Sequence, residues 1–94
     1  MQVVIRTYTG QGEAELSDAM EQREEDVKEL ISGVPGFVSY AAFRGDDGFM
    51  TVTACQDKAG TDESSTRAAA WVKENVSTAV DPPEVTQGST FLQF

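Results

Sequence analysis

The spacing of apolar and polar residues predicts that the chain begins with a strand and a helix. Residues 2–8, QVVIRTY, are β-branched and aromatic, which is typical of a strand, and two nearby glycines end it. Across residues 15–32 the apolar side chains recur at three- and four-residue steps among many acids. This period indicates one amphipathic helix, which ends at Gly33 because glycine and the following Pro35 do not continue a helix.

The next segment predicts a β-hairpin whose side chains divide into two sets. Residues 37–44 and 49–56 are its arms, and the Gly-Asp-Asp-Gly stretch between them is a strong turn signal. We expect one set to pack under the helices: Phe37, Ser39, Ala41, Phe43, Met50, Val52 and Ala54. The set expected on the opposite face is Val38, Tyr40, Ala42, Arg44, Phe49, Thr51, Thr53 and Cys55, of which only one is charged.

The remaining residues predict a second helix and a last strand. The helix begins near Thr61 or Asp62, each a good N-cap, and runs to about Val76. Residues 84–93 follow a Pro-Pro link and read as a strand, whose inward set is left open. Either Val85, Gln87, Ser89 and Phe91 or Thr86, Gly88, Thr90 and Leu92 face inward. The order βαββαβ predicts a single α+β domain over residues 1–94: a ferredoxin-like sandwich, with a four-stranded antiparallel sheet and two helices on one face.

One face of this sheet has nothing in the chain to cover it. Two helices, each about 10 Å across, cover one face of a sheet roughly 19 Å wide, and no element remains for the other. A sheet face exposed to water carries more charges than the single arginine of the second hairpin set. The pattern therefore predicts a homodimer formed through this face.

Charge and composition narrow the classes of partner. The 94 residues hold sixteen acids and seven basic residues, a formal net charge of −9, which repels phosphate backbones and anionic membranes. We therefore expect neither nucleic acid nor a membrane as a partner. Eight acids lie in residues 13–29, as a solvated helix face or, alternatively, a docking surface. The single Cys55 and the lack of a leader pattern predict a cytoplasmic protein.

The chain has no histidine, which limits its chemistry. It has no imidazole base that titrates near neutral pH, no proximal histidine for haem and no histidine-rich metal site, so we expect neither metal nor cofactor. Any catalysis must come from carboxylates, Tyr, Cys, Lys or Arg, or from the reactivity of the substrate.

Candidate ligand contacts lie along the second helix. Arg67, Trp71 and Asn75 are four residues apart and therefore share one flank of the helix. With Phe43 and Met50 they are the candidate lining of a pocket, in which Trp71 stacks on an aromatic ligand and the polar pair holds its oxygen. In the alternative, Trp71 closes the edge of the core and Arg67 covers its ring.

A second polar group is expected on the face that forms the dimer. Tyr40 and Arg44, with Arg6 and Tyr8 of the first strand, would bind an anion or lower the pKa of a tyrosine there. The alternative is that they satisfy one another across the interface. Cys55 lacks a histidine to activate it, so we expect a buried, inert thiol.

Several stretches together resemble the dimeric α+β-barrel superfamily, and within it the antibiotic biosynthesis monooxygenase-like domains. They are the Val-Pro-Gly-Phe junction at residues 34–37, the GFVSYAAFR strand, and the RAAAWVKEN segment of the second helix. The resemblance implies two sheets that form a barrel at a dimer interface, with a ligand pocket between each sheet and its helices. Some members oxidise polycyclic aromatic substrates with O₂ and no bound cofactor, and others degrade haem.

The family's functional residues are only partly present. Trp71 matches the tryptophan of the second helix, but the cofactor-free members place an Asn four residues before it, where this chain has Arg67. Its own Asn75 lies four residues after the tryptophan, and Cys55 stands where many members carry another Trp. The haem-degrading members use an Asn on the first strand and a His, and both are missing here.

Two functions follow from the resemblance. The first is a cofactor-independent monooxygenase acting on a hydrophobic aromatic metabolite, which predicts an open apolar cavity between sheet and helices. The alternative is a non-catalytic, dimeric ligand-binding or stress-related module of the same fold. The alternative predicts no polar constellation inside.

Overall fold

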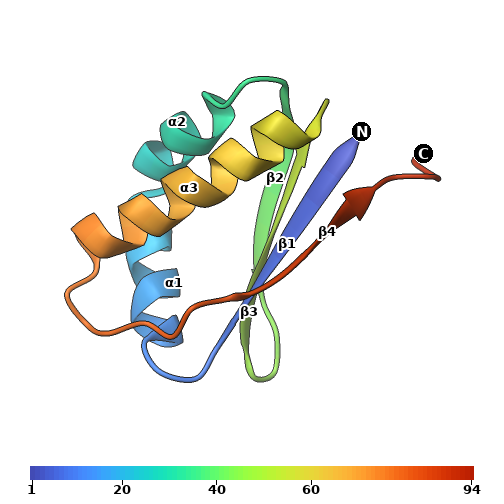
Figure 1. Ribbon diagram of the computed structural model, residues 1–94. Coiled ribbons are helices and arrows are strands. Elements are labelled where there is room, and N and C mark those ends of the chain that lie inside the picture. Colours follow the sequence, from blue (N-terminus) through green and yellow to red (C-terminus); the bar gives the residue numbers. More distant parts are fainter.

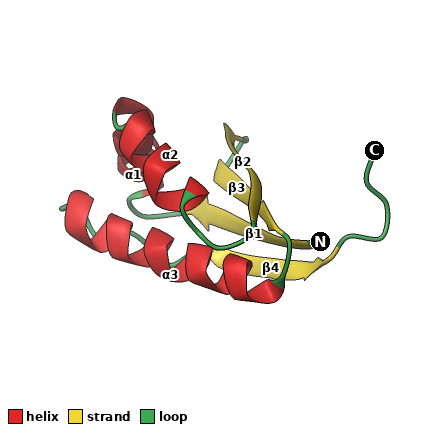
Figure 2. Cartoon of the chain, turned by 90° about the horizontal axis from the view of Figure 1, so that it is seen from above, coloured by secondary structure: helices red, strands yellow, loops and turns green.

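The chain folds as one antiparallel sheet with all its helices on one face (Figures 1 and 2). The computed structural model describes residues 1–94. Its elements are β1 (Gln2–Thr9), α1 (Glu13–Gln22), α2 (Glu24–Ser32), β2 (Phe37–Arg44), β3 (Gly48–Cys55), α3 (Lys58–Asn75) and β4 (Glu84–Ser89). The strand order β2-β3-β1-β4 confirms the predicted ferredoxin-like fold. No helix is both long and apolar enough to cross a membrane.

The predicted first helix is in fact two helices. Arg23 leaves helical geometry, with φ −114° and ψ 41°, and separates α1 from α2. Its N–H donates to the Ala19 carbonyl at 3.0 Å, which closes α1, and its carbonyl accepts from the Val27 N–H at 3.1 Å. Three acids follow directly at residues 24–26, where a helix N-terminus favours negative charge. The sequence therefore contains a helix start that the apolar period does not show.

The helix α3 begins earlier than predicted, because its N-cap is Asp57 rather than Thr61 or Asp62. The Asp57 carboxylate accepts from the Gly60 N–H at 3.3 Å. Gly60 lies close to Pro35, which precedes β2, and to Cys55 at the end of β3. A Cβ at this position would come within 2.4 Å of the Pro35 carbonyl oxygen and 2.8 Å of the Cys55 Cβ. Only glycine permits the helix to start this close to the sheet.

The two faces of the hairpin are the reverse of the prediction. Tyr40, Ala42 and Arg44 pair with residues of β3 that lie beneath the helices. The set expected under the helices, apart from Phe37, therefore lies on the uncovered face: Ser39, Ala41, Phe43, Met50, Val52 and Ala54. The alternation along the strands was correct, but the assumption that the more apolar set packs under the helices was wrong.

The face of the sheet beneath the helices has an apolar end and a polar end. At the apolar end the rings of Tyr8 and Phe49 stack, with centroids 4.7 Å apart and planes at 7°, and Leu16 of α1 packs on them. At the polar end the fully buried side chains include Thr53 and Ser64. The helix-covered face therefore buries several hydroxyl groups as well as apolar side chains.

The other face of the sheet is apolar and has no covering element (Figure 2). Val3 and Ile5 of β1 join the apolar hairpin residues there. The strand β4 resolves the alternative left open by the sequence, because Val85 pairs with Arg6 and so belongs to the inner set, while Thr86 pairs with Ile5 and belongs to the outer set. The strand ends at Ser89, and the Thr90 N–H still donates to the Met1 carbonyl at 2.9 Å. The residues after Thr90 extend away from the sheet (Figure 1).

Candidate functional site

A cavity of about 650 Å³ lies between α1, α2 and the edge strand β2. Its size is within the range of small-molecule sites, which is about 300–1,000 Å³. The walls are mainly apolar: Met20, Val27 and Ile31 from the helices, and Phe37, Tyr40, Phe43 and Phe49 from the sheet. The charged residues Glu21, Glu24, Lys28 and Arg44 also line it. The cavity is therefore suited to a flat, mostly apolar ligand with a polar end.

Beside this cavity, Arg6 of β1 is buried among hydroxyl groups. Its side chain is 2% exposed. Nη2 donates to Ser64 Oγ at 2.6 Å and to Ser65 Oγ at 3.1 Å, and Nε donates to Ser65 Oγ at 3.3 Å. Nη1 donates to the hydroxyls of Thr51 and Thr53, both at 3.3 Å. The guanidinium is thus fully hydrogen-bonded, but no carboxylate pairs with it.

Burial shifts the pKa of Arg6 and of the two tyrosines beside it. Loss of solvation lowers the pKa of Arg6, an effect that nearby Tyr8, Tyr40 and Cys55 oppose. Burial raises the pKa of Tyr40 to about 12, against the opposing effect of the Arg6 charge, and also raises the pKa of Tyr8. Both tyrosines are consequently neutral hydrogen-bond donors near neutral pH.

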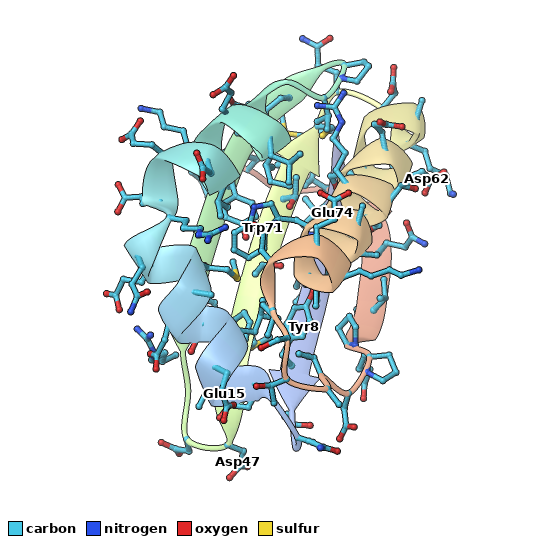
Figure 3. The ribbon with its side chains drawn as sticks, turned by 90° about the vertical axis from the view of Figure 1, so that its left-hand side faces the viewer. Tyr8, Glu15, Asp47, Asp62, Trp71 and Glu74 are labelled. Carbon is cyan, nitrogen blue, oxygen red and sulfur yellow. The ribbon has the colours of Figure 1, made fainter.

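A narrow cleft of about 20 Å³ connects Arg6 with the wall of the larger cavity. Arg6, Tyr8, Tyr40 and Trp71 are among its lining residues. Tyr40, with three apolar residues of α1 and α2, also lines the larger cavity, so its ring stands between the two spaces. Figure 3 shows Tyr8 and Trp71 between the ribbon of α3 and those of α1 and α2. A ligand in the larger cavity is therefore separated from Arg6 by one tyrosine and a cleft the size of a water molecule.

The three predicted contacts on the second helix do not converge on one cavity. Trp71 is half-buried and lines the narrow cleft. Arg67 instead donates from Nε to Glu63 at 3.0 Å and from Nη1 to the Leu30 carbonyl at 2.9 Å. Asn75 is tied to Trp71, whose carbonyl accepts from its Nδ2 at 2.9 Å, and to Arg23, which donates to its Oδ1. Arg67 and Asn75 thus join helices together and line neither space.

The other predicted site residues also lie in different places. Phe43 lines the large cavity although it belongs to the outer set, whereas Met50 points to the uncovered face, contrary to the prediction. Tyr40 and Arg44, expected on the dimer face, lie on the helix side. Arg44 pairs at 3.2 Å with each of two exposed acids of α1, Asp18 and Glu21.

Sequence reasoning named Arg6 but placed it on the wrong face, and it missed the serines that hold it. The sequence does place Val4, Arg6 and Tyr8 in one phase of β1, but the other phase is more apolar, so the pattern gave no signal that the helices cover the phase of Arg6. Cys55 is buried as expected, and burial followed by the nearby Asp57 raises the pKa of its thiol. No cluster of three or more acids and cysteine has the geometry of a metal site.

Comparisons with known proteins find the fold. No family model matches the chain, and no curated protein matches its sequence. Among solved structures, NE2512, a protein of unknown function from Nitrosomonas europaea, has a TM-score of 0.70 at 20% identity, over 99% of this chain and 90% of that one. The monooxygenase ActVA-Orf6 of Streptomyces coelicolor, in complex with the ligand nanaomycin D, has a TM-score of 0.67 at 18% identity, over 99% and 88%.

A third likeness is to a protein of different activity. The haem-degrader MhuD of Mycobacterium tuberculosis, with two haems in its active site, has a TM-score of 0.69 at 14% identity, over 100% of this chain and 99% of that one. At such identities the likeness shows the fold alone. It confirms the expected resemblance at that level: the chain has the ferredoxin-like α+β fold that a monooxygenase, a haem-degrader and a protein of unknown function share.

Proposed function

We propose that the chain binds a hydrophobic aromatic metabolite and oxidises it with O₂ as a cofactor-independent monooxygenase. The observation that carries the proposal is the cavity of about 650 Å³, with aromatic rings of β2 and β3 on one side and apolar helix residues on the other. Support also comes from the fold likeness to ActVA-Orf6, a monooxygenase observed with nanaomycin D.

The oxidation needs no redox group from the protein, because an electron-rich phenol or enol itself supplies the electrons that reduce O₂. An anthrone, for example, has a CH₂ group that O₂ converts to C=O with release of water, so that all atoms are accounted for. The protein binds the rings, keeps water away and donates a hydrogen bond to the ring oxygen. Tyr40 is suited to the last role because it lines the cavity and its raised pKa keeps it protonated.

We further propose that the protein acts as a homodimer formed through the uncovered face of the sheet. This face carries Val3, Ile5, Phe43, Met50 and Val52, and its only charged residue is Glu84 at the edge strand. An apolar sheet face with no covering element favours packing against a second copy about its two-fold axis.

A second function, ligand binding without catalysis, is favoured by one observation. Arg67 and Asn75, the polar residues expected in the pocket, are tied to neighbouring helices and do not reach the cavity. Tyr40 is then the only tyrosine that lines the cavity, and its hydroxyl group is enough to hold a ligand without catalysis.

The test is titration of the protein with 1,8-dihydroxyanthrone, following Trp71 fluorescence and then O₂ consumption. We expect saturable quenching and O₂ uptake above the spontaneous rate measured without protein. The variant Ala42→Phe, which fills the cavity, should lose both signals, whereas Ala69→Phe on the exposed side of α3 should keep them. Binding without extra O₂ uptake would favour the non-catalytic function, and no binding by the unmodified protein would contradict both.

A further inference from the structure

The only charged side chain buried in the molecule is Arg6, and no acid compensates it. Its five N–H groups all donate to hydroxyl oxygens. The guanidinium therefore has its hydrogen bonds, but it has no anionic partner. Taking such a charge out of water costs several kcal/mol, and hydroxyl groups return only part of this energy. Buried charges of this kind cluster at functional sites, so the uncompensated Arg6 points to a functional role for its electric field.

Scarcity of acids does not explain the missing partner. The chain has sixteen acids and seven basic residues. Three exposed or half-exposed basic residues, Arg44, Lys58 and Arg67, each have an acidic partner within 3.2 Å. The one basic side chain for which a carboxylate would bring most stability is surrounded by Ser and Thr instead.

We propose that Arg6 makes the cavity select ligands that bind as anions, with an ionised phenol, enol or carboxylate on the aromatic ring directed towards Tyr40 and the narrow cleft. The inference rests on the proposed function, since it assumes that the cavity holds an aromatic ligand. It names the charge state of that ligand and the residue that sets it.

The surroundings of Arg6 leave its field available to a ligand. The titratable groups that face it are Tyr8 on its own strand, Tyr40 on β2 and Cys55 on β3, and the residues of α3 against it are serines. Burial raises the pKa of all three titratable groups, so none is negative near neutral pH. The cleft that contains Arg6 has Tyr40 in common with the cavity, so the field of Arg6 reaches the cavity across one side chain and a cleft with room for about one water molecule.

The charges around the large cavity act more weakly. Lys28 and Arg44 oppose Glu21 and Glu24, and all four are exposed to solvent. Salt screens such exposed charges over about 8 Å at physiological ionic strength, whereas a buried charge is screened much less. Arg6 is therefore the one charge near the inner end of the cavity that solvent screens only weakly, although the whole protein carries −9.

The test uses 4-nitro-1-naphthol, whose ionised form absorbs at longer wavelength than its neutral form. An apolar cavity alone raises the pKa of a bound phenol, whereas a nearby cation lowers it, so the two explanations predict opposite shifts. With the unmodified protein in excess, we expect the pKa of the bound naphthol to fall about one unit below that of the free compound. A pKa at or above the free value overturns the inference.

Two variants assign the shift to Arg6. Arg6→Met should raise the pKa of the bound naphthol above the free value, and Arg6→Lys should keep it lowered. Arg67→Met, which removes a charge that lines neither space, should leave it unchanged. An Arg6→Met protein that still lowers the pKa would overturn the inference. If Arg6→Met does not fold, the inference is still tested by the other two proteins. A pKa of the bound naphthol at or above the free value in the unmodified protein or in Arg6→Lys overturns it.

Binding of matched neutral and ionised probes separates this inference from the proposed function. We expect 2-naphthoate to bind at least about tenfold more tightly than 2-naphthamide, which has the same rings without the charge. Equal affinity would overturn the selection by charge and leave an aromatic-binding cavity intact. If neither compound nor the anthrone binds, the proposed function fails and the inference fails with it.

Discussion

The two faces of the sheet reverse the usual relation between polarity and burial. The inner face, covered by three helices, contains Arg6, Thr51 and Thr53, all nearly inaccessible to solvent. The outer face, which no element covers, contains Val3, Ile5 and Val52 and a single acid at its edge. In an antiparallel sheet with one wet face the apolar side chains face the core and the polar ones face water.

The reversal has a simple explanation if both faces are buried in the working protein. The outer face then supplies the apolar surface of a dimer, where sheet packs against sheet. On the proposed function the inner face borders the ligand site, which explains why it carries polar groups that reduce stability. Natural proteins often depart from the most stable arrangement at functional sites. Three experiments test this difference between the outer and the inner face.

The largest effect is expected from a charge at the centre of the outer face. Val52 pairs with Ile5 on one side and Ala41 on the other. In a two-fold dimer, Val52→Glu buries two carboxylates at once, so we expect the dimer to dissociate at least about 1,000-fold more readily. Sedimentation equilibrium measures this. The control Ala69→Glu, on exposed α3, should not change association, and a Val52→Glu protein that remains dimeric would exclude this face as the interface.

A pair of phenylalanines compares the faces directly. Phe49 is 2% exposed and stacks on Tyr8, whereas Phe43 is 50% exposed. In the Val52→Glu background, where only the monomer is measured, Phe49→Ala should lower the free energy of unfolding by about 3–4 kcal/mol and Phe43→Ala by less than about 1 kcal/mol. Urea titration gives both values. Similar losses for the two variants would show that the outer face is packed within the monomer.

The smallest effect concerns Tyr40 and appears only at alkaline pH. Its pKa is raised in the folded protein to about 12 from the usual 10.0. The unfolded chain therefore releases the proton first as the pH rises, so that stability is complete below pH 10 and falls between pH 10 and 12. We expect this tyrosine to contribute a loss of about 1 kcal/mol between pH 9 and 11, which Tyr40→Phe should remove. Chemical unfolding at several pH values measures the difference.

The sequence was sufficient to predict the topology, but not to predict which face of the sheet lies beneath the helices. Strands and helices follow from local periods, so βαββαβ and the strand alternation were recovered, and the Gly-Asp-Asp-Gly turn fixed the hairpin register. The choice of face depends on which set the helices contact, and that is a tertiary property. The assumption that apolar residues pack under helices failed because Arg6 and its hydroxyl partners occupy that space.

The candidate site was only partly predictable for the same reason. Trp71 was expected beside a ligand space and lines the narrow cleft, but helical spacing alone cannot tell whether Arg67 and Asn75 reach the same space. Their partners, the Leu30 carbonyl and Arg23, belong to another segment of the chain. The segment predicted as one helix over residues 15–32 is also interrupted at Arg23, because the acids that follow start a second helix.

The break at Arg23 has a consequence for how the cavity wall behaves when empty. The helices α1 and α2 have ten and nine residues, and isolated helices shorter than about 12–15 residues are marginal in water. Their order therefore depends on contacts with the sheet, and on the side facing the cavity some of those contacts are missing. A bound ligand replaces them, so amide hydrogen exchange in α1 and α2 should slow on binding while exchange in β1 and β3 changes little.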